Sequence, residues 1–543
     1  MYKGFVIAIG CVVLAVSSQA QDTTRTINIT STYKPVLREP AKVQFNAAPP
    51  VADSSRPVLN YSIPAENLFF SYQPADLTPS ALTPDSASGW NYSNYIKAGV
   101  GNVYLPYIKA GMSFGDGTNT FFNLFASHFS ARGDLDFQKS SQTAVQGILT
   151  YKTESGLEWT GGLGFKSDNY NLYGFRPDSL QFDKNDLRQN FQTLEGRLAL
   201  RNIVPTEFGI SYNPSLKVSY FSDNYKPGTA EANTVLDLPV SKMFNETVGI
   251  KLGVQADLTN YRLNEPTKTS YNNNLFLAKP SLLFRNENVN LHAGVIPSWD
   301  QGDFHLLPNL MADITTNDQR ATLQVGWIGY YNKGAYQRFA SINPWLRRPD
   351  SLMNTRVQEG YLGLKGSAGS HFTYSAKIGF QQHFNAPLFV NDTIDGKQFN
   401  IRYEPKLNIF QTHLEAAYQK GEQLLVKAGF NWNSFSKIQR ESEAWGMLPM
   451  ELNASFRLQV MKDLWFKTEA WAFNGARFLD KNNNDFKGQS GFDLNAGAEF
   501  RLTRNFNIWF QLNNILNNKY ERWNQYQVYG FNLLGGLVYN FDN

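Results

Sequence analysis

Few residues of this 543-residue chain have the types and spacing that chemistry requires. The six histidines are scattered without metal-ligand spacing, and no nucleophile elbow or phosphate-binding loop occurs in the sequence. They are His128, His292, His305, His371, His383 and His413. The run from Asp480 to Asp485 resembles a calcium loop, but it has no glycine at its sixth position and no closing glutamate, so a surface turn is the better interpretation. The sequence therefore predicts no catalytic, cofactor or metal site, and no enzyme.

Opposite charges two residues apart are the remaining candidate site. The pairs are Glu195 with Arg197, Lys467 with Glu469, and Glu499 with Arg501. In a strand, residues two apart point to the same face, so each pair lies on one face of a sheet. Charges remain ionised only where water or a partner is present. The pairs indicate a hydrated face, where they either bind a ligand or brace the wall; bracing is favoured.

The segments that carry these pairs have one apolar and one polar face. Near the C-terminus, Phe492, Leu494, Ala496, Ala498 and Phe500 alternate with Asp493, Asn495, Gly497, Glu499 and Arg501. The pattern restarts at 506–513 and also marks 248–258, 372–380 and 424–432. Two structures give a period of two: a soluble antiparallel sheet with a dry core behind it, or a membrane barrel with an apolar outside and a polar lumen.

The arrangement of turns favours the membrane barrel. From residue 93 to 543, tight polar turns alternate with long loops. The segments between them have the length of membrane strands. We expect an all-β, antiparallel up-and-down transmembrane barrel of about 22 strands, with about 16–20 as the alternative. No repeat at the spacing of propeller blades is visible. Aromatic residues near segment ends predict interfacial girdles: Trp90, Tyr92, Tyr95, Tyr330, Tyr331, Trp465, Trp523 and Tyr526.

The N-terminal part differs from the rest. Residues 1–20 have a positive start, an apolar run and a small-residue cleavage site, which predicts a secretory signal peptide. The only cysteine, Cys11, lies within it, so the exported chain has no disulfide. Residues 21–92 are rich in proline and predict either a linker or a periplasmic segment that occludes the barrel mouth. A net charge of +4 indicates no nucleic-acid partner.

The C-terminal stretch resembles the last strands of TonB-dependent receptors. The residues that carry this resemblance are Asn513–Asn517, Lys519, Tyr520 and a closing strand with Gly536, Tyr539 and Phe541. That strand is similar to the assembly signal of bacterial outer-membrane barrels, which implies recognition by the barrel assembly machinery. The asparagine-rich and aromatic-rich style resembles plugless receptor-like barrels of the Bacteroidota. The globular plug and TonB box of the family are not recognisable before the first predicted strand.

The resemblance implies solute uptake across the outer membrane of a Gram-negative cell, in contact with lipid and with a periplasmic energy-coupling protein. The alternative is a non-transporting scaffold in an outer-membrane assembly or a surface-lipoprotein complex. A barrel enzyme such as a lipase is a third class, which the absence of a Ser/His motif disfavours. A barrel of about 22 strands encloses a wide lumen, so we expect inward side chains such as Trp465, Trp471 and Trp509, folded loops, residues 21–92 or a partner to fill it.

Overall fold

The computed structural model describes residues 94–541, except 117, 225–227 and 264–268. The predicted signal peptide, the proline-rich segment 21–92, and the aromatic residues Trp90 and Tyr92 lie outside the described residues. Within those residues, no helix is long and apolar enough to cross a membrane.

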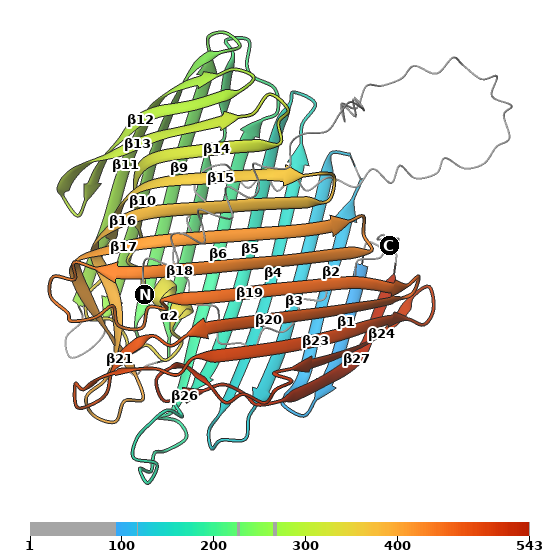
Figure 1. The fold of residues 1–543 in the computed structure, drawn as a ribbon, viewed down its shortest axis with the longest axis vertical. Coiled ribbons are helices and arrows are strands. Elements are labelled where there is room, and N and C mark those ends of the chain that lie inside the picture. The colour runs from blue at the N-terminus through green and yellow to red at the C-terminus, as the bar shows by residue number, and fades with distance from the viewer. Residues whose placement is uncertain (1–93, 117, 225–227, 264–268, 542–543) are drawn as a thin grey trace, which may run out of the picture. The chain divides into compact units, whose positions relative to one another are not determined.

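One large antiparallel sheet contains most of the described chain (Figure 1). Its first strands are β1 (Asn94–Gly101), β2 (Tyr104–Gly115), β3 (Thr120–Arg132), β4 (Lys139–Lys152), β5 (Leu157–Asn171), β6 (Arg188–Asn202), β7 (Ile210–Tyr212), β8 (Ser215–Asp223), β9 (Ala230–Met243), β10 (Val248–Leu263), β11 (Thr269–Arg285) and β12 (Val289–Asp300). They are followed by β13 (Asp303–Thr315), β14 (Ala321–Asn332), β15 (Thr355–Ala368), β16 (Phe372–Asn391), β17 (Phe399–Lys420), β18 (Leu424–Ser436), β19 (Met450–Met461), β20 (Leu464–Asn474), β23 (Gly491–Arg501), β24 (Phe506–Asn513) and β27 (Asn532–Phe541).

The remaining elements lie in connections between these strands. They are the helix α2 (Tyr336–Ile342) and two small hairpins, β21 (Arg477–Leu479) with β22 (Asp485–Lys487), and β25 (Glu521–Trp523) with β26 (Tyr526–Gln527).

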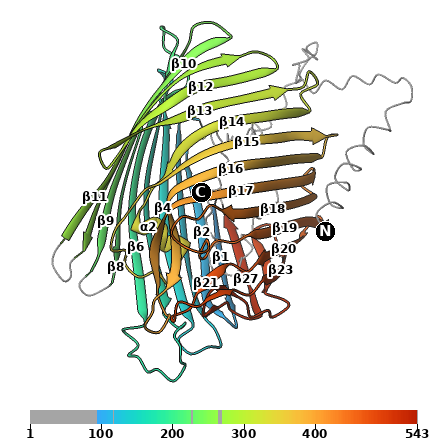
Figure 2. The same ribbon diagram turned by 60° about the vertical axis from the view of Figure 1, so that its left-hand side comes forward.

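The sheet closes on itself because β1 pairs with β27, from Asn94 opposite Phe541 to Gly101 opposite Leu534. The 23 segments of the sheet form a barrel of 22 strands, because β7 and β8 are two parts of one barrel strand and both pair with β9. The break between them falls at Asn213 and Pro214, where proline cannot donate to a ladder. The predicted all-β barrel of about 22 strands is confirmed. Figure 2 shows the front strands crossing the back strands at an angle, as in a tilted barrel.

The two faces of each strand differ as the alternation predicts. On β10, Val248, Ile250, Leu252 and Val254 are exposed on the outside of the barrel, while Asp257 on the other face is buried. On β23, Phe492 and Phe500 point out, and Asp493 and Glu499 point in. The outer surface is thus an apolar band continuous over the strands, which is what lipid requires.

The two rims of the barrel differ in the length of the connections between strands. One rim, here the terminal rim, holds the start of β1 and the end of β27 and has short turns such as 153–156, 421–423 and 502–505. The opposite rim, here the loop rim, has the long connections. Those are 172–187, 333–354, 392–398, 437–449, 475–490 and 514–531. The predicted alternation of tight turns with long loops is confirmed, and in membrane barrels the long loops are extracellular.

The predicted aromatic girdles are wrong for five residues. Tyr330 lies on the lumen face of β14, opposite the buried Val357 of β15. Tyr95 packs inward at the seam, and Trp465 is buried on the lumen side of β20. Trp523 and Tyr526 are fully buried inside the loops of the loop rim. A strand end and a loop that folds into the lumen have the same local sequence signature, so position near a segment end did not separate them.

The seam between β1 and β27 has two glycines opposite each other, Gly99 and Gly536. A Cβ at Gly536 would overlap the carbonyl oxygen of Ala98, and a Cβ at Gly99 would overlap the indole of Trp509. The ring of Trp509 therefore contacts the backbone at Gly99, and the ammonium of Lys97 lies 4.0 Å from the ring centroid. Glycine at these places lets the last strand approach the first.

We expect Gly536→Val to lower the free energy of unfolding of the barrel by about 1–3 kcal/mol, the usual effect of overpacking. The measurement is urea unfolding in detergent micelles, followed by the electrophoretic mobility shift of the folded barrel. Gly161→Val is the matched control, because a Cβ there meets nothing within 4 Å. Equal midpoints for the two variants would contradict the close approach at the seam.

Candidate functional site

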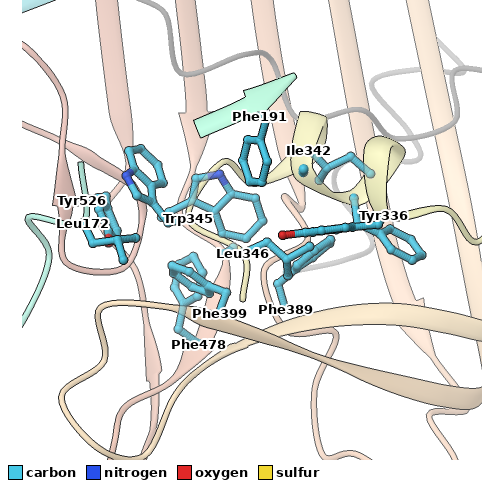
Figure 3. Close-up of a cluster of buried hydrophobic side chains, with 14 of the residues drawn as sticks. Leu172, Phe191, Tyr336, Ile342, Trp345, Leu346, Phe389, Phe399, Phe478 and Tyr526 are labelled. Carbon is cyan, nitrogen blue, oxygen red and sulfur yellow. The ribbon is translucent and has the colours of Figure 1, made fainter. Parts of the chain in front are cut away.

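Six long loops of the loop rim fold into the lumen, and together they are here called the cap. The cap comprises 172–187, 333–354, 392–398, 437–449, 475–490 and 514–531. Five of these loops share a hydrophobic core, and 392–398 joins them through hydrogen bonds such as that from the hydroxyl of Tyr526 to the carbonyl of Lys397. The core packs on inward residues of the wall such as Phe191 (Figure 3) and also on Phe221. Loop residues that join this core include Leu172, Leu187, Tyr336, Phe339, Trp345, Leu346, Leu448, Phe478, Trp523 and Tyr526. The lumen is therefore filled at this end by folded loops, one of the fillings expected from the sequence.

Aromatic stacking joins three loops at the centre of the cap. The rings of Trp345 and Tyr526 are stacked with centroids 3.8 Å apart and planes at 21°. Tyr173 meets both rings edge-on, at 4.9 Å from Tyr526 and 6.0 Å from Trp345. Such pairs add about 0.5–1.5 kcal/mol each beyond the burial of their surface. The three loops are therefore held to one another as a unit.

The helix α2 packs against the wall beneath the loop rim. Its buried residues are Tyr336, Phe339, Ala340 and Ile342, which form an apolar side. Glu231 of β9 accepts hydrogen bonds from the backbone N–H of Tyr336 at 2.5 Å and of Gln337 at 3.3 Å, and so satisfies the first turn of a helix that has no side-chain cap of its own. The hydroxyl of Tyr336 donates to Asp223 at 2.9 Å.

Buried carboxylates on the wall hold the other loops in the same way. Glu404 of β17, which is fully buried, accepts backbone N–H bonds from Gln439, Arg440 and Glu441 at 2.8, 2.9 and 2.8 Å. Asp493 of β23 accepts a hydrogen bond from the hydroxyl of Tyr520 at 3.0 Å. A hydrogen bond to a charged group contributes about 1.5–3 kcal/mol, so these few side chains fix where the loops attach.

The loop that contains α2 has a second, neutral attachment. The side chains of Asn273 and Asn354 exchange hydrogen bonds at 2.7 and 3.0 Å, and both also bond the backbone of Gly334. The ammonium of Lys333 lies 3.3 Å from Asp257. Burial lowers the pKa of Lys333, and the nearby Asp257 opposes this shift. Burial also lowers the pKa of Arg338, to about 10, so this guanidinium stays charged at neutral pH.

A recess of about 820 Å³ lies beneath the cap, on the lumen side of β2 to β6. Its roof includes Tyr173, Trp345 and Tyr526, and its floor includes Gly162 and Gly164 of β5. The floor is open at both glycines, where an added Cβ would find its nearest neighbours 3.8 and 3.9 Å away. The volume is in the range of pockets that hold small molecules.

Charged and hydroxyl groups line the wall of this recess. Basic and acidic side chains there are Lys109, Lys166, Arg197, Asp168 and Glu195. Lys139 borders the recess at the start of β4, but it has the parity of the outward residue Val145. Burial raises the pKa of Tyr173 and raises that of Tyr529 to about 12, so both phenols are neutral at physiological pH. They are hydrogen-bonded, Tyr173 to the carbonyl of Gln527 at 2.8 Å and Tyr529 to Ser140 at 2.9 Å.

Of the predicted charge pairs, the structure places one at this recess. Glu195 and Arg197 both lie on its wall, but Glu195 forms its ion pair across strands, with Lys217 of β8 at 2.9 Å. The sequence therefore located these two residues on the lumen face without identifying the partner. The aromatic roof was missed, because its residues lie in loops without periodicity; the density of aromatic residues in those loops was the available signal.

The other two predicted pairs lie elsewhere in the lumen. Lys467 and Glu469 are half-buried on the inward face of β20. Glu499 lies 4.0 Å from Lys97 across the seam and accepts a hydrogen bond from Asn507 at 2.6 Å. Arg501 lies 3.7 Å from Asp463.

The C-terminal residues of the predicted assembly signal lie on both faces of the last strand. In β27, Gly536 belongs to the inward set and Tyr539 and Phe541 to the outward set, where their rings stack at 5.4 Å. Among the described residues, no group of three or more His, Cys, Asp or Glu side chains has the geometry to hold a metal ion.

We expect Glu404→Gln to loosen the attachment of loop 437–449, because the amide replaces a charged acceptor of three backbone N–H groups by a neutral one. The measurement is the rate at which trypsin cleaves after Arg440 in the folded protein, which should rise. Glu415→Gln is the matched control, since Glu415 lies on the same strand and pairs with His413 at 3.1 Å. Equal cleavage rates for the two variants would show that Glu404 does not hold the loop.

Comparisons with known proteins identify the barrel architecture. No family model matches the sequence, and no curated protein matches it. Solved structures do resemble it. The FrpB iron transporter from Neisseria meningitidis has a TM-score of 0.64 at 10% identity, covering 83% of this chain and 81% of that chain. The siderophore receptor PirA from Acinetobacter baumannii has 0.64 at 8%, covering 82% and 80%. The ferric enterobactin receptor PfeA from Pseudomonas aeruginosa, in complex with enterobactin, has 0.63 at 10%, covering 82% and 81%. At these identities the likeness is one of fold.

Proposed function

We propose that this protein is an outer-membrane barrel that takes up a solute. The observation that carries the proposal is a recess of ligand size, roofed by folded loops, inside a closed barrel with an apolar outer band. A barrel that served only as a wall for partners would need no such chamber. The recess lies under the loop rim, where a solute from outside the cell arrives first.

The likeness in fold to siderophore receptors suggests which solutes to test first. Structures similar in fold include an iron transporter and receptors for siderophores. We infer that ferric siderophores are the first candidate solutes and that a TonB-type periplasmic protein supplies energy. Export by the signal peptide 1–20 and recognition of the last strand, with Gly536, Tyr539 and Phe541, by the barrel assembly machinery belong to the same proposal.

The test is accumulation of radiolabelled iron by cells that contain or lack this protein, supplied with a panel of ferric siderophores. We expect one member of the panel to accumulate only in cells that contain the protein, and a protonophore to abolish the difference. Equal accumulation for the whole panel, together with a stoichiometric partner in native membrane extracts, would contradict uptake and support the scaffold alternative.

We also propose that residues 21–92 occlude the terminal rim. Deleting them, with the signal peptide retained, should increase the single-channel conductance of the purified protein in a planar bilayer. A barrel of 22 strands encloses a wide lumen, so removal of an occluding segment opens a path for ions. The full chain measured under the same conditions is the control. An unchanged conductance would contradict occlusion of the terminal rim by residues 21–92.

A further inference from the structure

Two basic side chains in the recess, Lys109 and Arg197, have no acidic partner among the described residues. No carboxylate there lies within ion-pair distance of either side chain. The two carboxylates of the recess are already engaged, Asp168 with Lys166 at 2.9 Å and Glu195 with Lys217 at 2.9 Å. The wall therefore presents positive charge that no described residue neutralises. A lumen with low-dielectric walls concentrates such a field on whatever enters it.

The roof adds a second kind of recognition. Trp345, Tyr526 and Tyr173 form one aromatic cluster that lines the recess from above. Aromatic rings bind flat solutes by stacking or edge contact. Trp345 and Tyr526 are buried against each other, so the half-buried Tyr173 is the ring of the cluster that a solute in the recess would meet. Since the pKa values of Tyr173 and Tyr529 are raised by burial, their hydroxyls add no negative charge that would offset the basic wall.

The floor gives the recess its depth. Gly162 and Gly164 alternate on the lumen face of β5. Because these positions carry no side chain, a ligand reaches the backbone of the wall there. A larger residue at either place would fit and fill the space, since the atoms nearest to an added Cβ are backbone oxygens of β4 at 3.8 and 3.9 Å, an ordinary contact distance.

From this geometry we propose that the recess binds a small anionic solute with a flat ring, its charged groups facing Lys109 and Arg197 and its ring facing Tyr173 of the aromatic roof. The inference rests on the proposed uptake function and identifies the place and the chemistry of the bound solute. Gly162 and Gly164 make room for it, and Lys109 and Arg197 select its charge.

The probe is pyranine, a polysulfonated pyrene that is flat, strongly anionic and fluorescent. Its binding to the purified full chain in a non-ionic detergent is followed by fluorescence anisotropy, and methylene blue is the flat cationic comparison. We expect saturable binding of pyranine, none of methylene blue, and weaker binding of pyranine as ionic strength rises, because salt screens the basic wall.

Two kinds of variant locate the binding. The double variant Lys109→Gln with Arg197→Gln should weaken pyranine binding by about tenfold or more, which is about 1.4 kcal/mol or more. Lys365→Gln is its matched control, since Lys365 is a half-exposed lysine of β15 that lies 3.8 Å from Asp313 and does not line the recess.

Gly162→Trp should abolish binding by filling the floor. Gly161→Trp places the same ring on the lipid face of β5 and should leave binding unchanged.

Folding of each variant is verified by the mobility shift of the closed barrel, so that a lost site is distinguished from a lost fold. Absence of saturable pyranine binding by the wild-type chain would overturn the proposal, as would binding that survives Gly162→Trp or that Lys365→Gln weakens equally. Uptake is measured separately. Pyranine binding with the expected variant pattern, in a protein that accumulates no solute in cells, would refute the uptake function and leave the site standing.

Discussion

Backbone hydrogen bonding in lipid is the constraint on which the rest of this structure depends. No water is present in the hydrocarbon layer, so a free strand edge there would leave its N–H and C=O groups unpaired. Pairing of β1 with β27 removes the edges of the sheet. Closure then assigns each residue to lipid or to lumen by its parity alone. The small residues at the seam, Gly99 and Gly536, are a local consequence, because the last strand must approach the first within the distance of a backbone ladder.

A closed sheet of this size creates a second requirement, since its lumen is too wide for wall side chains to fill. The cap meets it with a hydrophobic core whose surroundings are polar, because the lumen face of the wall is polar. The apolar residues that the wall does offer, such as Phe191 and Phe221, pack against this core without fixing its exact position. Glu231, Glu404 and Asp493 supply that position by accepting hydrogen bonds from loop groups. Aromatic stacking then joins the loops to one another, so that packing gives the cap cohesion and charge-assisted hydrogen bonds give it location.

The sequence predicted the parts of the fold that have a period. Alternation located the strands, their two faces and their approximate number, and Phe492 and Glu499 lie on the faces that it indicated. It failed where loops enter the lumen, because a loop has no period and its core depends on residues far apart in the chain. Trp523 and Tyr526 were therefore placed at the membrane interface, whereas the cap buries them. The partners of the lumen charges could not be predicted either. Lys217 lies opposite Arg197 in the register of β6 and β8 and pairs diagonally with Glu195, which the sequence alone does not show.

The cap both fills part of the lumen at the loop rim and roofs the recess, so entry of a solute and opening of the lumen concern the same contacts. Trp345 lies on the loop that contains α2, and its stack with Tyr526 joins that loop to 514–531. Gln189, on the wall, donates a hydrogen bond at 2.9 Å to the carbonyl of Leu346, the next residue along. Displacing either loop alone would expose one aromatic face of the stack to water, and displacing both together keeps the stack intact. Concerted motion of these loops therefore disrupts less apolar burial than separate motion, and the wall hydrogen bonds at Glu231, Gln189 and Asp493 are among those that such a motion has to break.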